Sequence, residues 1–411
     1  MRLLNVETLQ LKSFLNEETR PPYAILSHTW LSDTEEVTFE DLLGYYKAVA
    51  QEKLLVATSI PPRARSKKTL PSRVGFKKIL PSRARPKKIL PSRARSNRII
   101  ASRAGFKKIL ASRAGSKKIQ GYCNIVARGR NLKWAWIDTC CIDKRSSAEL
   151  SEAINSMFKW YRDAKQCYVF LRDVTGSQYD PSFQKSKWFT RGWTLQELIA
   201  PKKLSFYNKN WRLIGKMHED LKLCGVVSSI TLIPVAFLRG APLTDACVAK
   251  RMSWASKRQT TRPEDKAYCL LGIFDVNMPL LYGEGSKAFI RLQEEIINHI
   301  YDDSILAWGT VNAGTPPLFR QVLDPEAHSS DQGALATSPE DFEDCGDFEK
   351  ALGFFQAQNN PDFQITTAGV KLGVDIFMGA PYALCKGEAC GAMDQDGALL
   401  LPRPDAAIRL L

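Results

Sequence analysis

The sequence predicts an α/β fold in which a parallel sheet is flanked by helices. Short apolar runs that suit strands, such as residues 23–27 (YAILS) and 167–171 (CYVFL), alternate with longer segments that have apolar residues at helical spacing. These short runs are apolar throughout, which is typical of strands buried on both faces of a parallel sheet. The alternation and the buried strands together favour helices on both sides of the sheet.

The strands and helices of the first half can be placed in order. We expect strands over residues 23–27, 134–138, 167–171 and 204–207, and helices over 118–128, from 146 onward and over 190–200. The helix that begins near Ser146 has the clearest signal, because Glu149 follows Ser146 at the spacing of a capping box. Its apolar residues then recur every three or four positions, as in a helix with one buried face.

The pattern changes beyond about residue 215. Residues 265–274 and 286–301 read as helices, and the second has an apolar stripe formed by Phe289, Leu292, Ile296, Ile297 and Ile300. Beyond residue 312 the chain is rich in Pro and Gly, and we place only short strands such as 373–377. We therefore expect three parts, which are a domain over 1–215, a mostly helical region over 216–310 and a weakly structured region over 311–411.

The positive charge is concentrated in one segment. The chain of 411 residues has a net charge of +15, yet residues 61–120 hold 20 Lys and Arg and no Asp or Glu, which leaves 38 basic and 43 acidic residues elsewhere. This segment repeats a unit of ten residues six times, from PPRARSKKTL to ASRAGSKKIQ. The period fits neither a helix nor a coiled coil, and each unit has too few apolar residues to fold alone. We interpret residues 51–117 as a disordered insertion.

Other functions remain open for this basic segment. An arm that binds polyanions through residues 61–120, or a nuclear-import signal, would use the same lysines and arginines. Elsewhere no apolar run is long enough to cross a membrane, and the first residues lack a signal-peptide pattern. Ten scattered cysteines fit a reducing compartment. We therefore expect a soluble cytoplasmic protein.

Several sequence blocks resemble the heterokaryon-incompatibility (HET) domain of filamentous fungi. They are YAILSHTW with EEVTFEDL, KIQGYCNIVARGRNLKWAWIDTCCIDK, SSAELSEAINSMFKWYRDAKQCYVFLRDV and SKWFTRGWTLQELIAP, at residues 23–30, 35–42, 118–144, 146–174 and 186–201. Residues 251–296 are similar to the region that follows this domain in many of these proteins. The chain departs from the family at Leu31, where Gly is usual, and by the repeat.

The resemblance implies a role in non-self recognition, in which fusion of genetically different hyphae leads to growth arrest or cell death. The family has been likened to TIR domains, which implies a TIR/flavodoxin-like sheet. Some TIR domains cleave NAD at its nicotinamide–ribose bond with a glutamate on the helix after the third strand, and others act by self-assembly. The resemblance therefore implies NAD as a substrate rather than a cofactor, and self-association or another incompatibility protein as partners.

Glu197 is the residue that matches the TIR glutamate, within SKWFTRGWTLQELIAP. A helix over 190–200 would place Trp193 and Glu197 on the face opposite Leu195, Leu198 and Ile199. Trp beside Glu suits either a cleft or a contact with the C-terminal region. In a cleft, the carboxylate would stabilise oxocarbenium character at the ribose. Alternatively, Glu197 pairs with Arg191 or a neighbouring lysine, and the tryptophans belong to the core.

The remaining candidates for substrate binding are His28, Trp30, Asp138, Arg191 and Trp193. His28 and Asp138 end the first and second expected strands, at the edge where α/β sheets collect ligands, and together they would bind a ribose or exchange protons. Either tryptophan ring would stack on a nucleobase or nicotinamide. The alternative is structural, with His28 bonded to turn backbone groups and Asp138 capping a helix.

Other chemistries lack their signatures. Cys140 or Cys141 with His28 and Asp138 has the residue types of a cysteine hydrolase, but no nucleophile motif surrounds them. The four histidines are dispersed, and neither a zinc pattern, a Walker A loop nor a G-x-G-x-x-G fingerprint is present. We therefore expect no metal. A non-catalytic module that self-associates, or an inactive copy, remains the alternative to an NAD-cleaving signalling domain.

Overall fold

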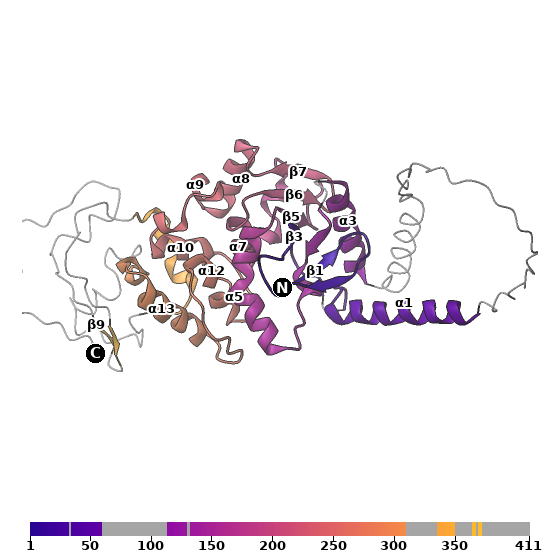
Figure 1. The fold of residues 1–411 in the computed structure, drawn as a ribbon. Helices are drawn as coiled ribbons and strands as arrows, with labels where there is room; N and C mark the ends of the chain where they lie inside the picture. The colour runs from indigo at the N-terminus through magenta and orange to yellow at the C-terminus, as the bar shows by residue number, and fades with distance from the viewer. Residues whose placement is uncertain are drawn as a thin grey trace, which may run out of the picture. The chain divides into compact units, whose positions relative to one another are not determined.

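The computed structural model has an α/β architecture in which a mixed sheet of seven strands is flanked by helices, within the described residues (Figure 1). It describes residues 1–32, 34–59, 113–129, 132–309, 335–349, 364–366 and 369–371. In this part of the chain, no helix combines the length and the apolar character needed to cross a membrane. The chain divides into two compact units, and each is described by itself.

The smaller unit comprises residues 2–15 and 31–143. Its strands lie in the order β2 (Leu11–Ser13), β1 (Arg2–Asn5) and β4 (Trp134–Trp136), and both neighbouring pairs are antiparallel. Its helices are α1 (Phe39–Ser59), α3 (Ala114–Arg128) and α4 (Asp138–Cys141). The prediction of a wholly parallel sheet was wrong here, because five residues join β1 to β2 and a connection this short permits only a hairpin.

The larger unit comprises Met1, residues 16–30 and the chain from residue 144 onward. Its strands follow the order β3 (Tyr23–His28), β5 (Gln166–Leu171), β6 (Leu204–Asn208) and β7 (Leu213–Lys216). The first three are parallel neighbours, whereas β7 runs antiparallel to β6 after a short connection. The predicted strands over residues 23–27, 167–171 and 204–207 are thus confirmed, and the antiparallel edge strand corrects the prediction.

Helices of this unit occupy the positions that sequence spacing indicated, with shorter spans. Helix α5 (Ser147–Asp163) begins after Ser146, whose hydroxyl accepts a hydrogen bond from the backbone N–H of Glu149 at 3.3 Å. The predicted helix over 190–200 is replaced by a 3₁₀ turn, η1 (Lys187–Thr190), and the short helix α7 (Thr194–Ile199). Short α6 (Pro181–Gln184) precedes them.

The elements beyond residue 215 belong to the same compact unit as β3, β5, β6 and β7. Helix α12 packs against α5, and α7 contacts both β3 and α9, so this region helps to enclose the sheet (Figure 1). The elements are α8 (Leu221–Thr231), α9 (Val235–Leu238), η2 (Leu243–Asp245), α10 (Val248–Ser256), α11 (Asp265–Tyr268), α12 (Leu271–Phe274), α13 (Lys287–His299), η3 (Asp303–Leu306), η4 (Pro339–Asp347), β8 (Gln364–Thr366) and β9 (Gly369–Lys371). The helix expected over 265–274 is divided into the short helices α11 and α12, and the helix expected over 286–301 is confirmed as α13 with altered bounds.

The basic repeat lies outside the described residues except for its last copy. Helix α3 starts at Ala114, four residues before the expected start at residue 118, so residues of the copy ASRAGSKKIQ form its first turns. Gly115, Lys118 and Ile119 are buried there. This part of residues 51–117 is therefore helical, which corrects the expectation of disorder for it. The strand expected over 373–377 lies outside the described residues.

Candidate functional site around Glu197

Glu197 lies on α7, a helix whose six residues are all buried. Glu197 is only 6% exposed, so its carboxylate does not face an open cleft. The reason is packing on several sides, because α7 contacts β3, α5, η1 and α9. A carboxylate in such surroundings needs polar partners, since burial without them is unfavourable by several kcal/mol (roughly 2–7 for a neutral polar group).

Ser27 supplies one partner for this carboxylate. Its hydroxyl donates to Oε2 of Glu197 and accepts a hydrogen bond from the indole Nε1 of Trp188 at 2.8 Å. All three side chains are buried. Ser27 is a polar residue in the middle of a strand that is buried at every position, and this hydrogen-bonded chain satisfies its hydroxyl. The three residues therefore join strand β3, turn η1 and helix α7.

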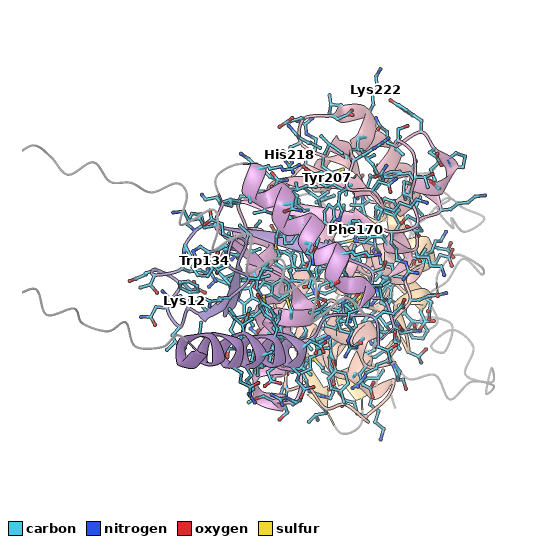
Figure 2. All side chains as sticks on the ribbon, turned by 90° about the vertical axis from the view of Figure 1, so that its right-hand side faces the viewer. Lys12, Trp134, Phe170, Tyr207, His218 and Lys222 are labelled. Atoms are coloured by element: carbon cyan, nitrogen blue, oxygen red, sulfur yellow. The ribbon has the colours of Figure 1, made fainter. Side chains whose placement is uncertain are left out.

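His28 lies next to Ser27 on β3 but points to the other face of the sheet. Side chains alternate along a strand, so a serine directed at α7 places the following histidine on the opposite side. In the strand register His28 is level with Phe170 on β5, which is level with Tyr207 on β6. Phe170 and Tyr207 are labelled in Figure 2. The structure therefore does not bring the imidazole and the Glu197 carboxylate together.

A second set of hydrogen bonds fixes the start of α7. The Thr194 hydroxyl lies 2.5 Å from the carbonyl oxygen of Trp188 and 2.9 Å from that of Arg191. Arg258 donates from Nη1 to the same hydroxyl at 3.0 Å and to the carbonyl of Arg191 at 2.9 Å. Arg258 is buried. The backbone of Arg191, a predicted binding residue, is thus engaged by the region beyond residue 215.

Residues 258–260 run beside residues 190–192 as a strap. The backbone N–H of Gln259 donates to the carbonyl of Thr190 at 2.6 Å, and the N–H of Gly192 donates to the carbonyl of Gln259 at 2.8 Å. A Cβ atom at Gly192 would lie 2.5 Å from Cγ2 of Thr260, so the close approach requires glycine there. These backbone hydrogen bonds hold the strap against residues 190–192, which lie between Trp188 and Trp193 in the sequence.

Trp193 contacts the C-terminal region, which is one of the two arrangements expected for it. It is half-buried at the N-terminus of α7 and lies close enough to Asp265 to act on the pKa of its carboxyl group. Burial raises the pKa of Asp265, and Trp193 and the Tyr282 hydroxyl, which is 3.0 Å from Oδ1, oppose that rise. The ring of Trp193 therefore belongs to the junction with α11.

The charges around Glu197 come from groups that are themselves buried. Burial lowers the pKa of Arg258 to about 10, and the attraction of Cys269 and Glu197 opposes this effect. Burial, followed by the charge of Glu197, raises the pKa of the Cys167 thiol on β5. Arg258 and Glu197 thus interact electrostatically in a medium where charges act more strongly than in water.

Trp30 and Asp138 each contact other residues of their own unit. The Trp30 ring is 37% exposed, and Nζ of Lys144 lies 3.3 Å from its centroid in a cation–π contact. Asp138 begins α4 in the smaller unit, where Oδ1 accepts from the backbone N–H of Thr139 at 2.8 Å. His28 belongs to the larger unit. A joint His28–Asp138 site therefore stays a prediction.

Chemically, the arrangement offers a carboxylate that is hydrogen-bonded to a hydroxyl and lies near a guanidinium group. Such a group can stabilise positive charge that develops at a carbon, or accept a proton. Because the carboxylate is buried, a substrate reaches Glu197 only if elements packed around α7 move. Opening of a closed site on binding is common among enzymes.

Sequence reasoning missed Ser27, Trp188, Thr194 and Arg258 as members of this network. Ser27 did carry a signal, because a serine inside the apolar run YAILS must find a buried partner. Arg258 carried none, since it lies 61 residues beyond Glu197 and only the fold brings its strap to α7.

Comparisons with known proteins show which family this chain resembles. The family model described as heterokaryon incompatibility protein (HET) matches residues 115–184. The Podospora anserina protein named vegetative incompatibility protein HET-E-1 is 41% identical over 296 residues, which is 70% of this chain. The chain carries a HET domain. The HET match begins at Gly115, inside the last repeat copy, which agrees with the place of that copy in α3.

Three further findings set the extent of these similarities. The HET-domain chain spans 17% of the length of the Podospora protein. A second family model, a domain of unknown function (DUF8212), matches residues 287–372, which include α13. No solved structure matches the chain.

Proposed function

We propose that this HET-domain chain acts in vegetative incompatibility, as a cytoplasmic signalling module that arrests growth or kills the cell. The observation that carries the proposal is the 41% identity over 296 residues with a protein named for vegetative incompatibility. That identity extends over 70% of the chain, so it includes more than the 70 residues of the HET match. We also propose a TIR-like arrangement for the parallel strands β3, β5 and β6, with partners that include a second copy or another incompatibility protein.

Expression of the whole chain in fungal hyphae tests the signalling role. We expect growth arrest or death when the chain is induced, scored by growth rate and by uptake of a dye that enters dead cells. Normal growth with full-length protein detectable by immunoblot would contradict the proposal. A chain with Glu197→Gln, expressed at the same level, separates the contribution of the Glu197 network from general toxicity.

Cleavage of NAD is the second function that we propose, with Glu197 as its carboxylate. Water adds to C1′ of the ribose as the bond to nicotinamide breaks, which yields ADP-ribose, nicotinamide and one proton. A carboxylate near C1′ would stabilise the oxocarbenium character of the transition state, as in glycoside hydrolysis. The observation in its favour is a buried carboxylate held by a serine hydroxyl beside a buried arginine.

Nicotinamide release by the purified chain tests this chemistry. We expect release by the wild type and none by Glu197→Gln, with an unchanged melting temperature within a few degrees. Glu219→Gln, at an exposed carboxylate in an ion pair with Lys216, is the matched control and should retain full turnover. Equal turnover by the wild type and Glu197→Gln would remove Glu197 from the reaction.

A module that signals through association alone is the alternative, and the burial of Glu197 favours it. A carboxylate with 6% exposure can serve the fold without meeting a substrate. This alternative predicts no nicotinamide release at any protein concentration, together with hyphal death that depends on surface residues. An inactive copy would instead give neither response.

A further inference from the structure

We propose that Arg258 is a positioning residue for the Glu197 carboxylate and acts on it through Thr194 and Trp188. The effect of Arg258 on turnover rests on the proposed cleavage of NAD. Its effect on the geometry around Glu197 is tested without NAD. Arg258 lies on the strap, two residues after α10 ends at Ser256, and so belongs to the region that follows the HET match. The inference gives this region a specific role at the site.

The first half of the connection runs from Arg258 to the backbone of Trp188. Nη1 of Arg258 donates to the Thr194 hydroxyl at 3.0 Å, and this hydroxyl donates to the carbonyl oxygen of Trp188 at 2.5 Å. With its single proton given to that carbonyl, the hydroxyl must accept from the guanidinium group. Arg258 therefore fixes the orientation of the Thr194 hydroxyl.

The second half runs from the side chain of Trp188 to Glu197. The indole Nε1 donates to Ser27 Oγ at 2.8 Å, and Ser27 donates to Oε2 of Glu197. Trp188 takes part in both halves, with its carbonyl in the first and its indole in the second. Its position therefore transmits the geometry set by Arg258 to the carboxylate, and hydrogen bonds in such a buried chain reinforce one another.

An arginine suits this position better than a lysine because its donors are fixed in one plane. Nε donates to the carbonyl of Trp254 at 3.2 Å while Nη1 holds Arg191 and Thr194, so the guanidinium group is anchored at both ends. Its positive charge also attracts Glu197. The thiol of Cys167 on β5 interacts electrostatically with Glu197, and the thiol of Cys269 after α11 interacts with Arg258.

Arg251 provides a matched control. It is also buried, lies on α10 and donates from Nη1 to a backbone carbonyl, that of Ile273, at 3.2 Å. Its guanidinium carbon lies 4.7 Å from the centroid of Phe274. None of the contacts described for Arg251 leads to Glu197. Loss of either arginine removes a buried charge with its hydrogen bonds, but only loss of Arg258 should disturb the carboxylate.

The test follows the Trp188 indole N–H by nuclear magnetic resonance in the full chain labelled with ¹⁵N-tryptophan. Trp188→Phe identifies the resonance. We expect Arg258→Met and Thr194→Val to shift it and to accelerate its hydrogen exchange about tenfold or more, since local opening becomes easier. Arg258→Lys should restore part of the protection. Arg251→Met should leave both quantities as in the wild type.

Each result for these variants supports or contradicts the positioning role of Arg258. An unchanged Trp188 resonance in Arg258→Met, or an equal change in Arg251→Met, would overturn the positioning role. Should Arg258→Met fail to fold, Thr194→Val decides, because it keeps the side-chain shape and removes only the hydroxyl. If the wild type releases nicotinamide, Arg258→Met should lower kcat and leave KM unchanged. A wild type without turnover would refute the NAD chemistry, while the resonance would still decide the role of Arg258.

Discussion

Lys118 and Glu36 form an ion pair in the interior of the smaller unit, and Lys118 belongs to the last copy of the basic repeat. Nζ of Lys118 lies 2.5 Å from Oε1 of Glu36, and each side chain is 5% exposed. The same oxygen of Glu36 accepts from the backbone N–H of Leu31 at 2.8 Å. Burial lowers the pKa of Lys118, and the charge of Glu36 opposes that change. The end of the repeat is therefore part of the fold.

Lys118→Met should destabilise the protein strongly. Removal of one partner leaves the Glu36 charge buried, and for buried pairs this loss is about 3–5 kcal/mol. Urea unfolding followed by tryptophan fluorescence measures the change in the free energy of unfolding. Lys117→Met is the matched control, because the neighbouring Lys117 is exposed and should change stability by less than about 0.5 kcal/mol. Equal losses for the two variants would contradict the buried pair.

Deletions of the repeat should differ according to whether its last copy is kept. Gly115 donates to the carbonyl of Glu35 at 2.8 Å, and Arg113 reaches Asp41 at 3.1 Å, so residues 111–120 are needed to dock α3. We expect a chain without residues 61–110 to give a cooperative unfolding transition near that of the full chain. A chain without 61–120 should be insoluble or melt well below it. Similar melting temperatures for both deletions would show that the last copy is dispensable.

Gly192→Ala should loosen the strap over α7. The added Cβ would lie 2.5 Å from Thr260 Cγ2 and 3.2 Å from Sγ of Cys269, and overpacking of this kind destabilises by about 1–3 kcal/mol. Gly225→Ala is the control, since nothing lies within 4 Å of a Cβ there and alanine in a helix is favoured over glycine by about 0.5–1 kcal/mol. Hydrogen exchange of residues 186–199 should quicken only in Gly192→Ala. Unchanged exchange would mean that the strap does not hold this segment.

Glu264 should contribute to stability at neutral pH and lose this contribution in acid. Hydrogen bonds from its own backbone N–H, and from those of Gly283 and Gly285 at 2.8 and 3.1 Å, lower the pKa of its carboxyl group. A carboxyl group with a lowered folded-state pKa stabilises above its unfolded pKa of about 4.3, and the effect is lost as pH falls below that value. The stability difference between the wild type and Glu264→Gln should therefore shrink from pH 6 to pH 3.5. A constant difference would contradict this assignment.

Elements with strong local signals were predictable from sequence, and tertiary contacts decided the others. Helix α5 and strand β5 follow from apolar spacing and from the cap at Ser146. The β1–β2 hairpin was not predicted, because the segments 2–5 and 11–13 are short and only three of their seven residues are apolar. The sequence places residues 111–117 of the last repeat copy in the insertion, because the burial of this copy depends on the pairing of Lys118 with Glu36, which lies 82 residues earlier.

The same contrast between local sequence signals and tertiary contacts applies to the candidate site. The resemblance to TIR domains singled out Glu197, and helical spacing placed Trp193 on the same face; the structure has Glu197 on a short helix and Trp193 at its N-terminus. Their partners could not be predicted, because Arg258 and Asp265 approach α7 only when the strap pairs with residues 190–192. The orientation of His28 follows from Ser27, whose bond to Glu197 no sequence pattern indicates.

The viability of hyphae that express the wild type, Glu197→Gln or Ser27→Ala at equal levels tests most directly whether the Glu197 network is the functional centre. We predict death with the wild type and survival with both variants, whose melting temperatures should show that they remain folded. Glu219→Gln should kill like the wild type. Death at wild-type rates with Glu197→Gln and Ser27→Ala would contradict the claim and leave this network a structural role.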